Sequence, residues 1–175
     1  MLKIREATSK DAALLSQLFE TSYRFHFSNL WLDKDELEKY LTEECSLETI
    51  STSLHTSEHK WFLAETADVN AKVIGFSKII INKTIPDENI TGLYLHKLYL
   101  IPHLTGKKYG EQLFDHVVKL GREWEQKWLW LEVLENNKNA IKFYANKGMQ
   151  KQKDIVFTSP KQQSTLHIMT KKLHD

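Results

Sequence analysis

Hydrophobic residues in the first third of the chain recur with the spacing of amphipathic helices. Residues 2–5 alternate as a short strand would, and residues 12–19 carry apolar side chains three and four positions apart. A second helix is predicted to begin at Asp33, where acidic residues occupy the first turn, and a weaker third helix is predicted at 46–55. The N-terminal third is therefore predicted to be a strand followed by helices.

From residue 60 the apolar positions alternate with period two, which is typical of half-buried strands. Residues 60–65 and 72–81 predict a hairpin across a polar turn, and a long strand at 91–102 closes at Pro102. The rest of the pattern predicts a helix at about 107–124, a strand at 128–134, a helix at 137–147 that stops before Gly148, and two final strands at 150–157 and 164–171. This order of elements favours one α/β (α+β) domain with a mixed, mostly antiparallel sheet.

Composition narrows the class of protein. The chain has 175 residues, of which 41% are apolar and 27% charged, as in an ordinary globular domain, so we expect a single domain over residues 1–175. The formal net charge of +1 argues against a nucleic-acid partner, since nucleic-acid binders usually carry a basic excess. No apolar run approaches the roughly 20 residues of a membrane span, and the N-terminus lacks an apolar signal core. We therefore expect no membrane partner and a cytoplasmic location.

Cysteine and histidine usage bears on redox and metal chemistry. Cys45 is the only cysteine, so an intramolecular disulfide and a cysteine-rich zinc site are excluded. The eight histidines include one pair with helical spacing, His55 and His59, and no third ligand lies nearby in sequence. An exposed polar pair is the simpler explanation, so no metal is expected.

The segment between the long strand and the following helix has the features of a phosphate-binding turn. Its sequence is L-T-G-K-K-Y-G, in which Gly106 and Gly110 let the backbone approach a ligand and Lys107 and Lys108 supply positive charge. A helix N-terminus presents unpaired N–H groups and the positive end of the helix dipole to an anion. A tight turn with close helix packing would also account for the two glycines.

Residues 95–114 resemble the acetyl-CoA-binding segment of the GNAT superfamily of N-acetyltransferases. That family carries a Q/R-x-x-G-x-G/A pattern, in which Thr105 stands at the Gln/Arg position, Lys108 at the first glycine and Gly110 at the last position. Gly106 occupies a position that is often glycine. Thr105 and Lys108 depart from the commonest residues, so binding of the pyrophosphate would depend mainly on main-chain amides and on the Lys108 cation.

A second motif lies on the predicted strand and helix at 128–149. It resembles the family pattern V-x-x-x-N-x-x-A-x-x-F/L-Y-x-x-x-G-F/M at seven positions: Val133, Asn137, Ala140, Phe143, Tyr144, Gly148 and Met149. The resemblance covers nearly the whole chain and is closest to bacterial spermidine/spermine N-acetyltransferases. It implies a GNAT-like single domain with a six- to seven-stranded sheet and helices on both faces.

The resemblance assigns two catalytic residues. Tyr144 would protonate the CoA thiolate as it leaves, and a phenol suits that step because its pKa is comparable to that of a thiol; a packing aromatic is the alternative. His96 is a polar residue among apolar neighbours on the central strand and would accept the proton of the amine. A hydrogen-bonded core histidine is the alternative there.

Cofactor contacts are also implied by the resemblance. The strand residues would pair with the pantetheine arm through their backbone, and Asn137 would contact that arm in addition to capping its helix. The cofactor-binding residues implied are Leu98, Tyr99, Leu100, Thr105, Gly106, Lys107, Lys108, Tyr109, Gly110, Glu111, Asn137, Ala140 and Phe143.

The acceptor amine is expected under the N-terminal helices, where three side chains could line its site: Tyr23, His26 and Trp31. Core packing at the helix junction is the alternative.

Charge is distributed unevenly along the chain. Residues 33–68 hold ten acids and three bases, whereas residues 97–175 hold fourteen bases and eight acids. An anionic cofactor in the basic part and a cationic acceptor in the acidic part fit this division, as do solvated helix faces.

These features together predict an acetyl-CoA-dependent N-acetyltransferase that acts on a primary amine by direct transfer in a ternary complex. The expected partner is a small-molecule amine or a polyamine such as spermidine or spermine, and a homodimer is left open. Two alternatives remain at this point. One is a non-catalytic CoA-binding regulatory or interaction module, and the other is an acetyltransferase of protein or peptide amines.

Overall fold

The computed structural model describes residues 1–104 and 107–174. Its strands and helices follow in the predicted order. They are β1 (Leu2–Glu6), η1 (Ser9–Asp11), α1 (Ala12–Phe27), η2 (Ser28–Leu30), α2 (Lys34–Glu44), α3 (Leu47–Leu54), β2 (His59–Thr66), β3 (Val73–Thr84), β4 (Thr91–Leu100), α4 (Tyr109–Glu123), β5 (Trp128–Leu134), α5 (Lys138–Asn146), β6 (Gln150–Ser159) and β7 (Gln162–Lys172).

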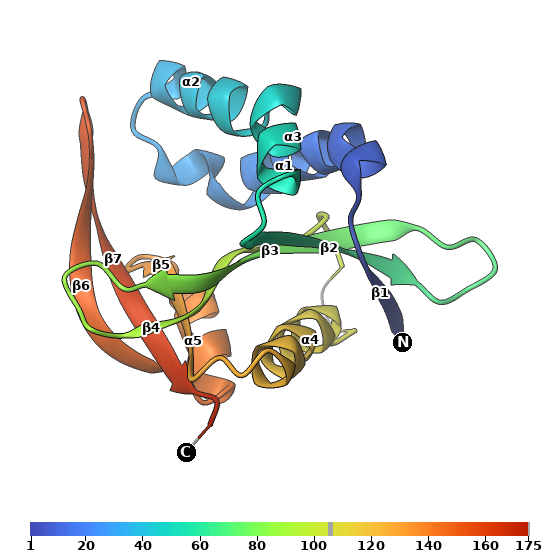
Figure 1. The fold of residues 1–175 in the computed structure, drawn as a ribbon. Helices are drawn as coiled ribbons and strands as arrows, with labels where there is room; N and C mark the ends of the chain where they lie inside the picture. The colour runs from blue at the N-terminus through green and yellow to red at the C-terminus, as the bar shows by residue number, and fades with distance from the viewer. Residues whose placement is uncertain (105–106, 175) are drawn as a thin grey trace. The chain divides into compact units, whose positions relative to one another are not determined.

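The seven strands form one sheet in the order β1-β2-β3-β4-β5-β7-β6 (Figure 1). Strands β1 and β2, β5 and β7, and β6 and β7 pair antiparallel, whereas β4 and β5 pair parallel. The prediction of a mixed, mostly antiparallel sheet of six to seven strands is confirmed.

The residues of the chain group into two compact units. Unit 1 comprises Met1–Ile79 and Lys97–Val117, and unit 2 comprises Ile80–His96 and the residues from Val118 onward. Strands β3 and β4 and helix α4 contribute residues to both units.

In unit 1, three helices pack on one face of the strands and a fourth on the other. Helices α1, α2 and α3 bury Phe19, Leu37 and Ile50, respectively, in one cluster with Trp61 and Phe76 of β2 and β3. On the opposite face, the ring of His116 on α4 packs against the ring of Phe62, with the ring centroids 4.9 Å apart. The expectation of helices on both faces of the sheet is therefore confirmed within this unit.

The starts of α2 and α3 follow from their capping residues. The Asp33 carboxylate accepts hydrogen bonds from the backbone N–H groups of Asp35 and Glu36, and the Ser46 hydroxyl accepts one from Thr49. The predicted starts of these two helices at Asp33 and Ser46 are confirmed.

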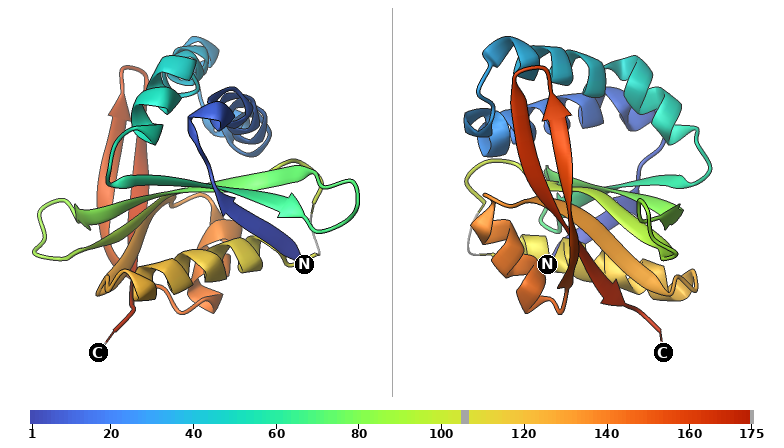
Figure 2. Two further views of the ribbon diagram at one scale, coloured as in Figure 1. Left: turned by 45° about the vertical axis from the view of Figure 1, so that its right-hand side comes forward. Right: turned by 90° about the vertical axis from the view of Figure 1, so that its left-hand side faces the viewer.

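In unit 2, β5 pairs with β7, and β7 pairs with β6 in a long hairpin (Figure 2). Trp130, Ile168 and Ile85 are almost completely buried together on one face. Helix α5 ends before Gly148, whose φ of 82° lies in the left-handed region that glycine tolerates best.

One detail of the predicted pattern is wrong. His55 is the C-cap of α3 and His59 begins β2, so these histidines do not share a helix face. Among residues 1–104 and 107–174, no group of three or more His, Cys, Asp or Glu side chains could hold a metal ion. No helix within the same ranges is long and apolar enough to cross a membrane.

Candidate functional site

In unit 2, the parallel pairing of β4 with β5 is short. Its register joins Leu93 to Leu129 and Tyr94 to Trp130. Within the part of unit 2 that the structure describes, the next residues of the two strands form no backbone pair with one another. The two strands therefore carry backbone groups beyond Tyr94 and Trp130 that they do not use in pairing with each other.

Two titratable side chains lie just past the last pair. His96 is two residues beyond Tyr94 on β4, and Glu132 is two residues beyond Trp130 on β5. Because strand side chains alternate between faces, His96 shares a face with Tyr94, and Glu132 shares one with Trp130. The Tyr94 ring stacks on Trp130 with centroids 4.1 Å apart and on His96 at 5.3 Å, so all four side chains belong to one face.

Glu132 is the acidic member of this group and was missed by the sequence analysis. Burial raises the pKa of its carboxyl group, while a hydrogen bond from Tyr94 and the charge of Lys83 lower it. Burial likewise raises the pKa of the Tyr94 phenol, so this group stays protonated at neutral pH. The signal in the sequence was a single acid in the apolar strand W-L-W-L-E-V-L.

Helix α5 holds the residues of the second motif. The Asn137 side chain accepts a hydrogen bond from the backbone N–H of Ala140 at 3.2 Å, which is the expected cap. Phe143 and Tyr144 meet edge to face with ring centroids 5.2 Å apart. Burial raises the pKa of the Tyr144 phenol to about 12, so the group holds its proton throughout the neutral range.

In unit 1, Leu98, Tyr99 and Leu100 form the end of β4. The chain approaches β3 closely here, because a Cβ on Gly75 would lie 2.6 Å from the carbonyl oxygen of Tyr99. Just after β4, the N–H of Ile101 donates to the carbonyl of Ile74 at 2.9 Å. Leu98, Tyr99 and Leu100 are each partly exposed.

The turn that leads into α4 contains the predicted phosphate-binding segment. Lys107 and Lys108 are exposed, whereas Tyr109, Gly110 and Glu111 form the first turn of the helix. Lys108 has a φ of 55°, so the backbone is left-handed at the position where the family pattern has its first glycine. Lys108 thus has a backbone conformation that glycine adopts with less strain, and Thr105 and Gly106 lie outside the described residues.

The three side chains predicted to line the acceptor site all belong to unit 1. The indole N–H of Trp31 donates to the Tyr23 hydroxyl at 3.1 Å, and both side chains pack against the core cluster of unit 1. His26 is exposed, and its Nε2 lies 3.1 Å from the carbonyl oxygen of Leu100. The structure therefore joins Tyr23 to Trp31 and brings His26 to the end of β4, and packing accounts for the contacts of Tyr23 and Trp31.

Two buried lysines were also missed by the sequence analysis. Lys97 of β4 is 4% exposed with Nζ 4.2 Å from the centroid of Phe19, and Lys78 of β3 is 7% exposed with Nζ 5.1 Å from that of Trp61. Burial lowers the pKa of each to about 8, and the charge of Lys78 further lowers that of Lys97. A lysine in an otherwise apolar strand was the only sign of them in the sequence.

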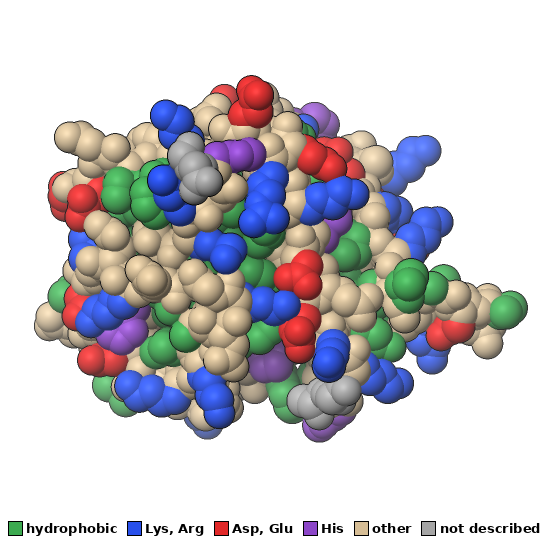
Figure 3. Space-filling model, turned by 90° about the horizontal axis from the view of Figure 1, so that it is seen from below, with side chains coloured by type: hydrophobic (Ala, Val, Ile, Leu, Met, Phe, Trp, Pro, Cys, Tyr) green, Lys and Arg blue, Asp and Glu red, His purple; other side chains and the backbone are tan. Residues whose placement is uncertain are grey.

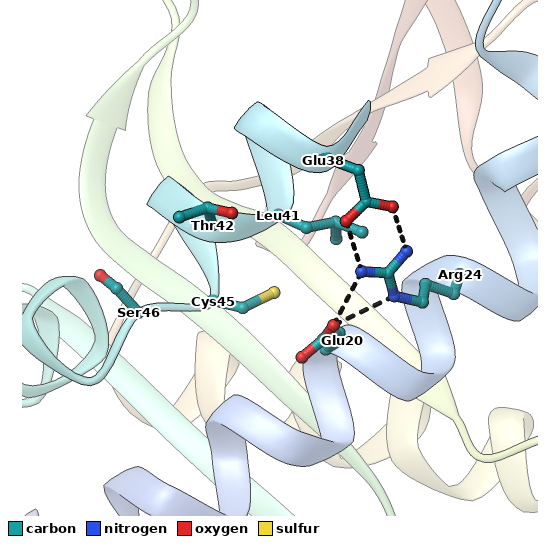
Figure 4. A pocket seen from close by; sticks show the side chains of 7 residues that line it. All are labelled: Glu20, Arg24, Glu38, Leu41, Thr42, Cys45 and Ser46. Carbon is teal, nitrogen blue, oxygen red and sulfur yellow. Dashed lines mark hydrogen bonds and ion pairs between the residues drawn. The ribbon is translucent and has the colours of Figure 1, made fainter. Parts of the chain in front are cut away.

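A hollow of about 250 Å³ lies between α1 and α2 in unit 1 (Figure 4). The charged side chains that line it form ion pairs with one another. The Arg24 guanidinium donates hydrogen bonds to the Glu38 carboxylate at 2.6 and 2.8 Å and to the Glu20 carboxylate at 2.9 and 3.0 Å. Burial raises the pKa of the Cys45 thiol, which also lines the hollow, to about 12, so this thiol is a poor nucleophile. None of the predicted site residues that the structure describes lines it.

The surface charge visible in Figure 3 is mixed. Lysine and arginine side chains spread over the face shown, with aspartate and glutamate side chains between them. Among the described residues, this face therefore has no continuous basic patch of the kind that binds nucleic acid.

Known proteins share both sequence and fold with the chain. The profile of the Acetyltransferase (GNAT) family matches residues 15–149. An uncharacterized N-acetyltransferase in the pepI 3′ region of Lactobacillus delbrueckii subsp. lactis is 32% identical over 106 residues, which are 60% of this chain and 61% of that relative. The match thus spans less than two thirds of the relative's length.

Solved structures extend the similarity over the whole fold. The PaiA N-acetyltransferase of Thermoplasma acidophilum, in complex with coenzyme A, is 23% identical with a TM-score of 0.76, covering 98% of this chain and 99% of that one. The spermidine/spermine N-acetyltransferase SpeG of Vibrio cholerae, in complex with manganese ions, is 18% identical with a TM-score of 0.65, covering 98% and 92%. SpeG is one of many such neighbours, and at these identities the likeness concerns the fold alone.

Proposed function

The chain belongs to the acetyltransferase (GNAT) family, and from this premise we propose that it transfers the acetyl group of acetyl-CoA to a primary amine. The observation that carries the proposal is the placement of His96 and Glu132 on one face of unit 2, just past the last backbone pair of β4 and β5. An amine must lose a proton before it can attack a thioester, and both side chains can accept one.

The cofactor is assigned to the residues named by the family motifs. The N-terminus of α4 offers the N–H groups of Tyr109, Gly110 and Glu111 to the pyrophosphate, with the exposed Lys107 and Lys108 as cations. Thr105 and Gly106 belong to the same segment of the motif. The backbone of Leu98, Tyr99 and Leu100 would pair with the pantetheine amides, to which the motif adds Asn137, Ala140 and Phe143.

The chemistry follows from the protonation states of the side chains. The acceptor ammonium loses a proton to His96, or to a water that His96 positions, and Glu132 shares this role on the same face. The amine nitrogen then bonds to the thioester carbonyl carbon, and backbone N–H groups of β4 stabilise the oxyanion. When the carbon–sulfur bond breaks, Tyr144 donates its proton to the CoA thiolate.

The protonation state of Tyr144 bears on this last step. The phenol is protonated before reaction, as a general acid must be, and its pKa of about 12 makes it a weaker proton donor than a free phenol, whose pKa is about 10. A non-catalytic CoA-binding module would not need that phenol. We therefore prefer an enzyme over a regulatory module.

For the acceptor we propose a polyamine such as spermidine or spermine. The support is the acidic composition of residues 33–68, which suits a cationic substrate, together with the fold shared with SpeG. Tyr23, His26 and Trp31 stay candidates for the lining of its site. A protein or peptide amine is the second candidate, because the family changes acceptors on one fold.

A thiol-release assay tests both parts of the proposal, acetyl transfer to an amine and the choice of a polyamine as the acceptor. Acetyl-CoA is mixed with the protein and with spermidine, spermine, lysine or short peptides in turn, and free CoA thiol and acetylated product are measured. Amine-dependent release with equal amounts of product is expected, fastest with the polyamines. Release with peptides alone would contradict the polyamine assignment, and acetyl-CoA binding without release on any amine would contradict the enzyme.

A further inference from the structure

Tyr94 occupies the centre of the titratable group in unit 2. Its ring is held on two sides, by Trp130 at 4.1 Å and by His96 at 5.3 Å, with interplanar angles of 21° and 20°. Backbone pairing with Trp130 fixes its strand position as well. The ring is therefore constrained by two stacking contacts and a register pair, so its hydroxyl has a defined direction.

The constrained phenol acts on Glu132. Glu132 follows Trp130 by two residues on the same face of β5, and its carboxyl group accepts a hydrogen bond from the Tyr94 hydroxyl. Hydrogen bonding by this hydroxyl favours the ionised carboxylate, in opposition to burial. Tyr94 thus contacts both candidate proton acceptors, one through its ring and the other through its hydroxyl.

Three other residues in the described part of unit 2 lie near Glu132 or beyond it across the sheet: Lys83, Ile168 and Lys153. From β3, Lys83 contributes a favourable charge. On β7 the residue opposite Glu132 is the apolar Ile168, and beyond it on β6 stands Lys153, whose ammonium contacts Glu88 at 3.7 Å. Lys153 is therefore engaged with another carboxylate, and Tyr94 is the hydrogen-bond donor that acts on Glu132.

We propose that Tyr94 is a positioning residue for the acetyl-transfer reaction, whose hydroxyl donates to the Glu132 carboxyl group and orients it on the face shared with His96, so that the acceptor amine can lose its proton there. This inference rests on the proposed function and adds to it a residue that no motif marks. Tyr94 touches neither reacting atom in this account and acts only through Glu132 and His96.

The test is the pH dependence of kcat/KM for the wild type, Tyr94→Phe and Glu132→Gln. Phenylalanine keeps both stacking contacts and removes only the hydroxyl. The acid limb of the Tyr94→Phe profile is expected to move to higher pH by about one unit. At pH values below the limb, kcat/KM should therefore fall tenfold, whereas at high pH it should stay close to the wild-type value. A loss of equal size at every pH, or an unmoved limb, would overturn the proposal.

A second measurement does not depend on activity. The Glu132 side-chain carboxyl, labelled with ¹³C and assigned by its loss in Glu132→Gln, is titrated by NMR in the wild type and in Tyr94→Phe. A higher midpoint in Tyr94→Phe is expected, and equal midpoints would overturn the inference even if no amine proved to be a substrate. Failure of the proposed function alone would instead appear as a shifted midpoint without acetyl transfer.

The matched control is Thr170→Val, which removes a buried hydroxyl from β7 opposite Trp130. Its carboxyl midpoint and acid limb are expected to equal those of the wild type. A shift in this control as large as in Tyr94→Phe would assign the effect to general loosening of the strands and overturn the positioning role.

Discussion

Replacement of Lys97 by methionine is predicted to stabilise the protein at neutral pH. Lys97 is 4% exposed, and burial, together with the charge of Lys78, lowers the pKa of its ammonium group from 10.5 to about 8. A difference of 2.5 pH units between the unfolded and folded states corresponds to about 3 kcal/mol against folding at pH 7. The contact with the Phe19 ring at 4.2 Å offsets about 1 kcal/mol of this. Methionine keeps the apolar stem, so a net gain of about 2 kcal/mol is expected.

The sign of the pH dependence distinguishes this explanation from simple repacking. Between pH 8 and 10.5 the unfolded chain binds a proton at this lysine that the folded chain does not, so wild-type stability rises with pH in that window. The advantage of Lys97→Met should therefore be full below pH 8 and fade toward pH 10.5. Urea unfolding at pH 7, 9 and 10.5 measures the difference, with the exposed Lys119→Met as control. A destabilised variant at pH 7, or an advantage that does not change with pH, would refute the reasoning.

Three further substitutions test other parts of the structure. Gly75→Ala places a Cβ 2.6 Å from the Tyr99 carbonyl oxygen and should lower stability to urea by about 2 kcal/mol, whereas an unchanged midpoint would contradict the close approach of β3 and β4. Asn137→Ala removes the cap of α5 and should reduce the free energy of unfolding by about 1 kcal/mol in the same assay. Lys108→Gly removes the strain of a φ of 55° and should raise the thermal midpoint by the equivalent of about 1 kcal/mol. Calorimetric titration should show that the same variant binds acetyl-CoA more weakly, because a proposed cation for the pyrophosphate is lost. Tighter binding would contradict that role of Lys108.

Local signals in the sequence accounted for the helices and their ends. The spacing of Leu15 and Phe19, the caps at Asp33 and Asn137 and the stop at Gly148 are all properties of a few neighbouring residues. Such features depend on backbone geometry within one or two turns, so they can be read from a single chain.

The titratable residues of the strands could not be assigned in the same way. Glu132 interacts with Tyr94 on β4 and with Lys83 on β3, and Lys97 packs against Phe19 of α1. Those contacts depend on which strands are neighbours and on the point where β4 and β5 stop pairing. The alternation of apolar and polar residues within one strand reveals neither of these. His96 was visible as a polar exception in the sequence, but its ring contact with Tyr94 was not.

The most direct test of acetyl transfer is the effect of Tyr144→Phe on turnover and on acetyl-CoA affinity, measured side by side. A general acid acts only as the thiolate leaves, so kcat should fall by about a hundredfold. The dissociation constant for acetyl-CoA, from calorimetric titration, should stay within about twofold of the wild-type value, because the phenyl ring is retained. Unchanged turnover, or a loss explained wholly by weaker acetyl-CoA binding, would contradict the role of Tyr144 as the proton donor.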